Sequence, residues 1–228
     1  MRRTLTAMCT MFSALTTIAG AQSVKSPTVG LLGGAAIFRL SDLDLRSTSL
    51  FNGTSKSKSN VGLQLGAFVR FPVNATWAVQ PELHYVQKGT TLDFGGTGQA
   101  AGSLKAILSY VEVPLLVRAA LSTTSAWRPF VVAGPSFAYR SGCKMTVTSG
   151  TTSLSVNCDA ITGSPDPFKT SDVGAILGGG VEYVIGSRFI GAQARYSRGL
   201  VTVATQNTSS SGQSPKNSGF SLLFSIGM

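Results

Sequence analysis

Apolar and polar residues alternate one by one along most of this chain. From Val61 to Phe71 every second residue is apolar, whereas the residues in between include two glycines, Gln64 and Arg70. The alternation resumes at Trp77, after a short polar turn. A period of two residues is typical of β-strands, because successive side chains point to opposite faces of a sheet. The pattern therefore predicts strands with one apolar face and one face that carries glycine and charge.

Eight strands are predicted in this way, with connections of two kinds between them. The strands are 28–40, 60–71, 77–88, 105–120, 128–140, 172–184, 188–200 and 218–228. Most exceed the roughly 5–6 residues usual in soluble proteins and suit the roughly 9–11 that cross a bilayer at a tilt. The connections are short at 72–76, 122–127 and 185–187, and long and polar at 41–59, 89–104, 141–171 and 201–217. Short turns at one end and long loops at the other are typical of transmembrane β-barrels.

The apolar face decides what kind of barrel is predicted. The last strand, for example, has Phe220, Leu222 and Phe224 on one face. A soluble ligand carrier would place such a face inside, but eight strands leave an interior just wide enough for side chains, and lipid accepts an apolar outer band. We therefore predict an all-β fold, an eight-stranded antiparallel transmembrane β-barrel with short periplasmic turns and long extracellular loops. Three strands contain Pro81, Pro114 and Pro135, where we expect local bulges.

The inner face of this barrel is predicted to hold a network of ion pairs. Alternation assigns three acids and three arginines to the lumen: Arg70, Glu82, Glu112, Arg118, Glu182 and Arg195. Buried charges must be paired, since an unpaired one costs several kcal/mol. His84 is a candidate member of the network. A proton or ion path is the functional interpretation, and a plug that fills the barrel is the structural one, which the narrow lumen favours.

Aromatic residues near the strand ends predict the two membrane interfaces. The predicted interface residues are Trp77, Trp127 and Phe189 beside the short turns, and Tyr85 and Tyr139 toward the opposite ends. Trp and Tyr favour the headgroup zone, because one end of the side chain is apolar and the other polar.

The N-terminal segment indicates export. A basic start, "MRR", precedes a moderately apolar run, and Ala19 and Ala21 form an A-x-A cleavage pattern. We predict a cleaved signal peptide at 1–21 and a barrel domain at 22–228. Charged residues make up 12% of the chain, against about 25% in a typical soluble domain. Cleavage removes two arginines, so 17 basic residues remain against 9 acidic ones.

Cleavage also leaves two cysteines, Cys143 and Cys158, in the longest predicted loop. An exported chain with two cysteines favours a disulfide, and the alternative is a pair of unlinked thiols.

Motifs for catalysis or cofactor binding are missing from the sequence. One histidine and two bridged cysteines do not make a zinc site, and no cofactor is expected. A lipid-cleaving site built on His84 and Glu82 is conceivable, but no serine is marked by its context as a nucleophile. Scattered basic residues in an exported chain argue against nucleic acid as a partner. Five lysines lie in predicted outer loops, where they would attract anionic lipopolysaccharide: Lys56, Lys58, Lys144, Lys169 and Lys216.

Three segments are distinctive: "QPELHY" at 80–85, "YVEVPLL" at 110–116 and "ARYSRGL" at 194–200. In this order and spacing they resemble a family of small outer-membrane β-barrels, often called porin-family or PorT-like proteins, and the resemblance spans about residues 28–228. It implies a barrel in a Gram-negative outer membrane, inserted by the barrel-assembly machinery, without catalytic residues. The chain departs from the usual pattern at its end, because Met228 stands where such barrels commonly have an aromatic residue.

Together these observations predict an integral outer-membrane barrel with a structural or surface-binding role and a lumen plugged by polar side chains. We do not expect an enzyme. The alternatives are a passive channel for small solutes and a lipid-modifying enzyme.

Overall fold

The computed structural model describes residues 26–41, 56–94, 102–121, 124–158, 169–201 and 216–228. These residues form nine β-strands: β1 (Thr28–Ser41), β2 (Lys56–Pro72), β3 (Trp77–Phe94), β4 (Gly102–Ala120), β5 (Trp127–Ser149), β6 (Thr152–Asn157), β7 (Ser171–Ile185), β8 (Arg188–Gly199) and β9 (Lys216–Gly227). Among the described residues, no helix has the length and apolar character of a membrane-spanning segment. The predicted signal peptide at 1–21 lies outside these residues and stays a prediction.

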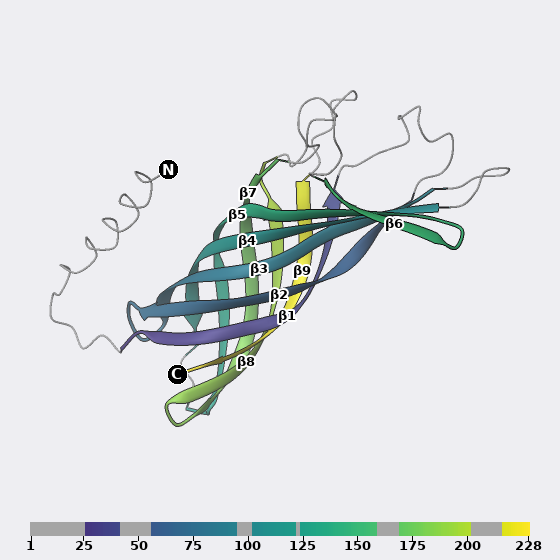
Figure 1. Ribbon diagram of the computed structural model, residues 1–228. Coiled ribbons are helices and arrows are strands. Elements are labelled where there is room, and N and C mark those ends of the chain that lie inside the picture. Colours follow the sequence, from purple (N-terminus) through teal and green to yellow (C-terminus); the bar gives the residue numbers. More distant parts are fainter. Residues whose placement is uncertain (1–25, 42–55, 95–101, 122–123, 159–168, 202–215) are drawn as a thin grey trace, which may run out of the picture.

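Eight of the strands close into a ring, as predicted. Each pairs antiparallel with its neighbours in the order β1, β2, β3, β4, β5, β7, β8, β9 (Figure 1). The first and last strands close the ring in a register that places Gly30 opposite Gly227. The backbones of Val29 and Met228 also exchange two hydrogen bonds of 3.0 Å. A closed ring leaves no strand edge exposed, which is what a membrane-spanning sheet requires.

The connections differ at the two ends of the ring. At one end, here called the turn end, short turns join β2 to β3 and β7 to β8. The side chain of Asn74 accepts hydrogen bonds from the backbone of Thr76 and Trp77 at 2.9 and 2.8 Å. Gly186 has a φ of 61°, which only glycine adopts readily. The opposite end, here called the loop end, carries the long connections.

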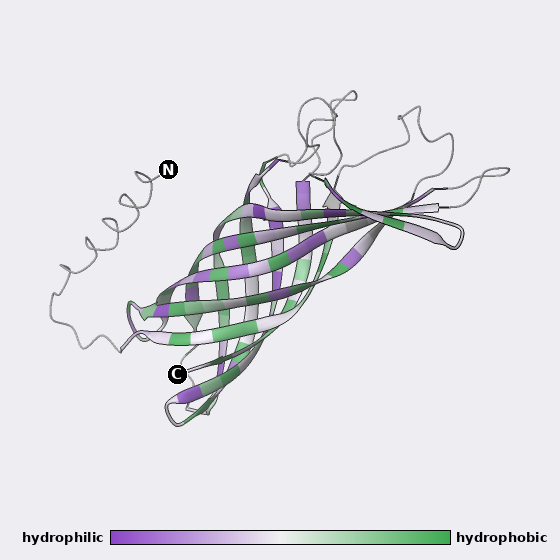
Figure 2. Ribbon diagram, viewed as in Figure 1, coloured by the Kyte–Doolittle hydropathy of each residue, from purple (hydrophilic) through white to green (hydrophobic). Residues whose placement is uncertain are grey.

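The outer face of the ring is apolar and exposed. Leu83, Leu115 and Leu222 have exposed fractions of 55%, 48% and 54%. Figure 2 shows apolar residues in green alternating with polar ones along the strands. Residues of the other parity, such as Leu223 and Arg195, are buried in the interior. The predicted assignment of faces is therefore right.

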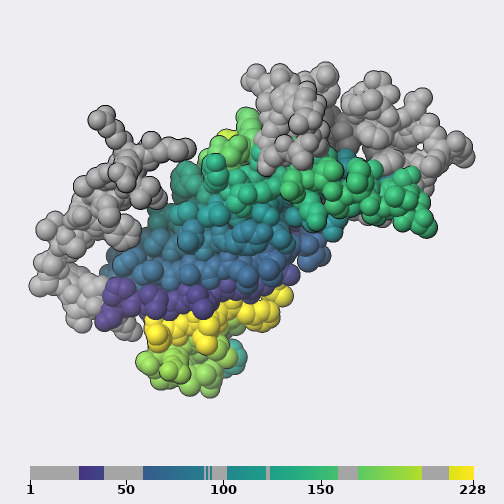
Figure 3. Space-filling model, viewed as in Figure 1, coloured from purple at the N-terminus to yellow at the C-terminus, as the bar shows by residue number. Residues whose placement is uncertain are grey.

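Beyond the ring, four neighbouring strands continue as a twisted sheet, and β6 joins its edge. We call this feature the loop-end sheet and define it as residues 89–94, 102–108, 143–149 and 152–157, with 56–59 of β2 beside them. It projects away from the ring, with the β5–β6 hairpin in green at its far end (Figure 3). The expectation that 89–104 and 141–171 are loops throughout is thus wrong, because parts of both extend the ladders.

The β-bulges of the ring do not coincide with the three strand prolines. The register between β3 and β4 is the same on both sides of Pro81, and that between β4 and β5 is the same on both sides of Pro114. Pro135 lies in an unbroken ladder with β7. The register shifts instead between Ser59 and Gln64 and between Ser109 and Tyr110. The expectation of bulges at the three prolines is therefore wrong.

Candidate functional site

The predicted lumen charges all lie inside the ring, and they divide into connected groups. The first group is built on Glu82 and Arg195, which are 4% and 2% exposed. Two guanidinium nitrogens of Arg195 donate to the two carboxylate oxygens of Glu82, at 2.6 and 2.8 Å. Gln193, beside Arg195 on the same face, accepts from it at 3.1 Å. The bidentate contact between Arg195 and Glu82 is the strongest geometry available to an arginine–carboxylate pair.

The second group is built on Glu182. It accepts hydrogen bonds of 2.7 Å from both Arg70 and Arg118. Arg70 also donates to Gln80, at 3.0 Å, and Gln80 donates to Glu82, at 2.6 Å. Hydrogen bonds on the inner face of β2 and β3 therefore connect the two groups.

A third group lies toward the loop end and includes two residues that the sequence reasoning missed. Lys88 is 3.1 Å from Glu112 and 3.8 Å from Asp172, and Asn217 donates to Asp172 at 2.8 Å. The expected arginine partner of Glu112 is thus replaced by Lys88. Alternation from His84 already places Lys88 on the inner face, so the pattern could have found it. Asp172 stands at the first residue of a predicted strand, where the pattern gives little guidance.

Lys88 is also enclosed by aromatic rings. Its ammonium nitrogen lies 5.2 Å from the ring centre of Phe38 and 5.0 Å from that of Tyr110. Such cation–π contacts help to offset the loss of water around a buried charge.

Apolar side chains pack in the lumen beside these charges. A cluster at the loop end includes Phe38, Leu108, Tyr110 and Cys143. Two further clusters contain Leu32, Phe68, Phe189 and Leu223, and Leu116, Phe130, Val132 and Ile176. The interior is therefore more apolar than the expected glycine-rich, charged face. A small cavity beside Lys88, Glu112 and Asp172 has a volume of about 10 Å³, which holds at most one water molecule.

His84 belongs to the lumen network and is 1% exposed. Its Nδ1 is 2.8 Å from the amide nitrogen of Gln64, and its Nε2 is 2.8 Å from Glu82. The pair considered as a lipid-cleaving site is thus enclosed and already engaged with Arg195. Among the described residues, no three His, Cys, Asp or Glu side chains are arranged to hold a metal ion.

Four of the five predicted interface aromatics lie on the outer face, and the fifth is buried in the lumen. The outer face carries Trp77, Tyr85, Trp127 and Tyr139, with exposed fractions between 40% and 63%. Trp127 packs against Tyr183, with ring centres 4.8 Å apart. Phe189 is a correction, because it is only 6% exposed and its ring centre lies 4.9 Å from the guanidinium of Arg70. Counting by twos from Arg195 places Phe189 inside, so a strict use of the alternation would have found this.

The outer face of the loop-end sheet carries two exposed lysines, Lys105 on β4 and Lys144 on β5. The register shift at Ser109 leaves Ser141 as an extra residue in β5, and its hydroxyl donates to the backbone carbonyl of Ser109 at 3.2 Å. A bulge reverses which alternate residues face outward. Because of it, Lys144 points outward and Cys143 points inward.

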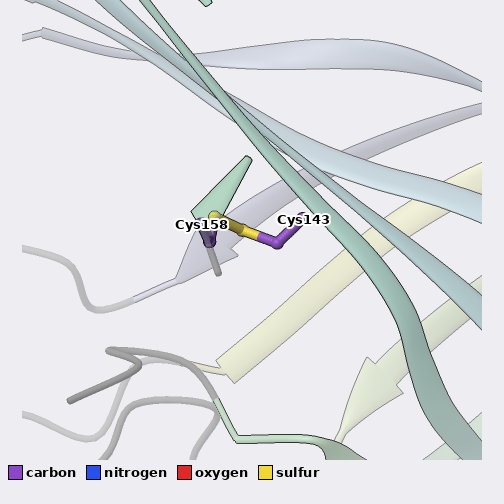
Figure 4. Close-up of a disulfide and its surroundings, with 2 residues drawn as sticks. All are labelled: Cys143 and Cys158. Carbon is purple, nitrogen blue, oxygen red and sulfur yellow. A yellow bond between two sulfur atoms is a disulfide. The ribbon is translucent and has the colours of Figure 1, made fainter. Parts of the chain in front are cut away.

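The predicted disulfide between Cys143 and Cys158 is confirmed (Figure 4). Cys143 lies in β5, and Cys158 directly follows β6, with 5.4 Å between their Cα atoms. The two residues are 8% and 7% exposed and belong to the apolar cluster at the loop end of the lumen. The bridge therefore closes the β5–β6 hairpin and packs within this apolar cluster as well.

Comparison with known proteins identifies the family of this chain. The family model described as the outer membrane protein beta-barrel domain matches residues 21–204. The chain belongs to this family. Membership confirms the resemblance found in the sequence and places the barrel in the outer membrane. By the rule for outer-membrane barrels, the turn end is then periplasmic and the loop end extracellular.

Solved structures of other small barrels are similar to this outer-membrane protein at low sequence identity. OprG from Pseudomonas aeruginosa is 14% identical, with a TM-score of 0.48 and coverage of 90% of this chain and 97% of that one. Neisserial surface protein A is also 14% identical, with a TM-score of 0.42 and coverage of 90% and 99%. The outer membrane enzyme PagL is 11% identical, with a TM-score of 0.37 and coverage of 88% and 98%. No curated protein sequence matches this chain.

Proposed function

We propose that this protein is a sealed, non-conducting outer-membrane barrel whose role is structural or surface-binding and resides in its extracellular sheet. The observation that carries this proposal is the filled lumen. Ion pairs join β2, β3 and β4 to β7 and β8 across the interior, and apolar clusters pack beside them. A hydrated ion needs a continuous water-filled path through the lumen. The packing of charged and apolar side chains therefore supports a lumen that is plugged by side chains.

The extracellular sheet supports the second half of the proposal. The strands β3, β4 and β5 continue beyond the ring, and the β5–β6 hairpin is closed by a disulfide. An ordered sheet of this kind presents fixed side chains at the cell surface, where a partner or the lipid surface can contact them. The lumen, in contrast, presents its polar groups only to one another.

Single-channel conductance in a planar bilayer tests this proposal. The full chain, refolded and inserted, is expected to give no stepwise current in concentrated potassium chloride, whereas an open porin in the same bilayer does. Heat-dependent migration on a gel checks that the inserted protein is folded. Reproducible steps from the folded protein would overturn the plug and support a passive channel.

A further inference from the structure

We propose that the outer face of the loop-end sheet binds phosphate groups of the anionic glycolipid in the outer leaflet, through Lys105 and Lys144. This inference deepens the proposed surface-binding function and rests on it. It depends on the register of the ladders, on unpaired charge and on the height of the two lysines above the apolar band.

The register brings the two lysines together on one face. Lys105 lies opposite Thr146, and Lys144 lies opposite Ile107, so the lysines are diagonal neighbours on adjacent strands. Diagonal neighbours in an antiparallel pair lie roughly 7–8 Å apart. The flexible lysine side chains can therefore bring both ammonium groups to a single phosphate.

Hydroxyl groups surround the pair on the same face. Thr91, Lys105, Thr146 and Ser155 follow one another across four strands. Thr146 and Ser155 share a hydrogen bond of 2.9 Å, and Thr148 and Ser153 share one of 3.0 Å in the next row. Hydroxyls donate to phosphate oxygens, and ammonium groups add charge to such hydrogen bonds.

Neither Lys105 nor Lys144 is neutralised by an ion pair with another described residue. One carboxylate lies nearby, because Asp93 of β3 is diagonal to Lys105 on the same face. The four basic residues of the lumen differ from them in this respect, because Arg70, Lys88, Arg118 and Arg195 each contact a carboxylate. Two exposed lysines outnumber the one carboxylate beside them, so a net positive charge remains beside the hydroxyls and is complementary to an anionic ligand.

The position of the two lysines above the membrane interface favours a membrane lipid as the anionic ligand. On β4, Val113 and Val111 face lipid, and Lys105 follows on the same face toward the extracellular end. Tyr139 marks the interface and lies opposite Val111, whereas Lys144 lies opposite Ile107, four residues further out. At about 3.3 Å per residue and a tilt of about 40°, Lys144 stands roughly 10 Å above the tyrosine, and Lys105, six residues beyond Val111, stands roughly 15 Å above it. A lysine can reach back toward the headgroup zone from there.

A binding titration with matched lipids tests the inference. The full mature chain, refolded in neutral detergent micelles, is titrated with fluorescent lipid A that carries both phosphates and with the same glycolipid after their removal. We expect tighter binding of the phosphorylated form. Since each lysine near an anionic surface contributes about 1 kcal/mol, the Lys105→Gln/Lys144→Gln variant should bind it about 30-fold more weakly.

Two further double variants act as controls. Arg188→Gln/Arg198→Gln removes the same charge at exposed positions outside the sheet and should bind as the native chain does. Lys105→Arg/Lys144→Arg keeps the charge and should retain binding. Equal weakening by both glutamine variants, or equal binding of the phosphate-free lipid, would overturn the site. The lipid titration tests the lysine site, and the conductance measurement tests the filled lumen. Failure of the lysine site is therefore distinguishable from failure of the proposed sealed barrel.

Discussion

At the scale of single residues, the charges in the lumen are explained by their pairing. Four acids and three bases are buried there among the described residues, and the partly buried Arg70 joins them: Glu82, Glu112, Asp172 and Glu182, with Lys88, Arg118, Arg195 and Arg70. Each is within 4 Å of an opposite charge. Removing one partner leaves an uncompensated buried charge, which costs far more than the pair itself contributes.

The pair of Glu82 and Arg195 gives a direct test at this scale. Glu82→Ala should lower the free energy of unfolding by about 3–5 kcal/mol, because Arg195 loses both of its carboxylate contacts. The double variant Glu82→Ala/Arg195→Ala should cost less than the sum of the two single changes. Urea titration of the protein in lipid vesicles measures all three values.

The control for this double-mutant cycle of Glu82 and Arg195 is a pair of residues that do not touch. Glu82→Ala combined with Lys144→Gln should be additive, because Lys144 points out of the barrel. Additive costs for Glu82 and Arg195 would mean that the two side chains are not neighbours in the folded protein.

At the scale of elements, the β5–β6 hairpin is held by two independent constraints. Six residue pairs, from Lys144 with Asn157 to Ser149 with Thr152, join its strands. The tight turn between them contains Gly150, with a φ of 58°. The disulfide closes the open end of the same hairpin. The barrel ring does not depend on this bridge, because Cys143 lies in the part of β5 that extends beyond the ring and Cys158 directly follows β6.

Cys143→Ser should therefore loosen the hairpin and leave the ring intact. Closing about 15 residues stabilises a loop by roughly 3 kcal/mol in the simplest chain-entropy model. We expect faster protease cleavage between Lys144 and Lys169 on whole cells, and unchanged heat-dependent migration of the barrel on a gel. Leu154→Ser, an exposed change in the same hairpin, is the control and should leave cleavage unchanged.

Two outcomes would contradict this account of the hairpin. Reaction of both cysteines with a maleimide without prior reduction would show that the bridge does not form. Cleavage that occurs only from the periplasmic side would show that the loop end is not extracellular.

At the scale of the whole molecule, the apolar outer band defines the membrane position. Trp77 and Trp127 lie at the periplasmic ends of β3 and β5, and Tyr85 and Tyr139 lie toward the extracellular ends. The exposed apolar residues between these levels contact lipid. The loop-end sheet lies beyond the upper level, so its exposed residues contact water or headgroups.

Substitution of two leucines of similar exposure tests which part of the outer face contacts lipid and which part contacts solvent. Leu222 on β9 is 54% exposed, and Leu154 on β6 is 65% exposed. Leu222→Arg should cost about 2–4 kcal/mol of folding free energy, because the arginine meets lipid near the middle of the bilayer. Leu154→Arg should be nearly neutral, because it meets solvent. Urea titration in vesicles checks both, and equal costs would disprove this membrane position.

The sequence alone determined the ring and most of its interior. Alternation with a period of two locates eight strands, separates lipid-facing from lumen-facing residues, and places Glu82, Glu182 and Arg195 inside. It does so because each strand of a barrel has only two faces and the two faces meet opposite environments. The same rule places Lys88 on the inner face, although the predicted network left it out, and applied strictly it would also have placed Phe189 inside.

Only the tertiary structure decided which charges pair, how far the strands extend and where the alternation changes phase. Pairing depends on which residues of distant strands meet across the lumen, as Glu82 of β3 meets Arg195 of β8. The loop-end sheet exists because β4 and β5 continue to pair where the sequence is polar and low in complexity. The bulge at Ser141 reverses the faces of β5, so Lys144 points outward and Cys143 inward. A single inserted residue has this effect because the side-chain period is two, and only the partner strand reveals which residue is left unpaired.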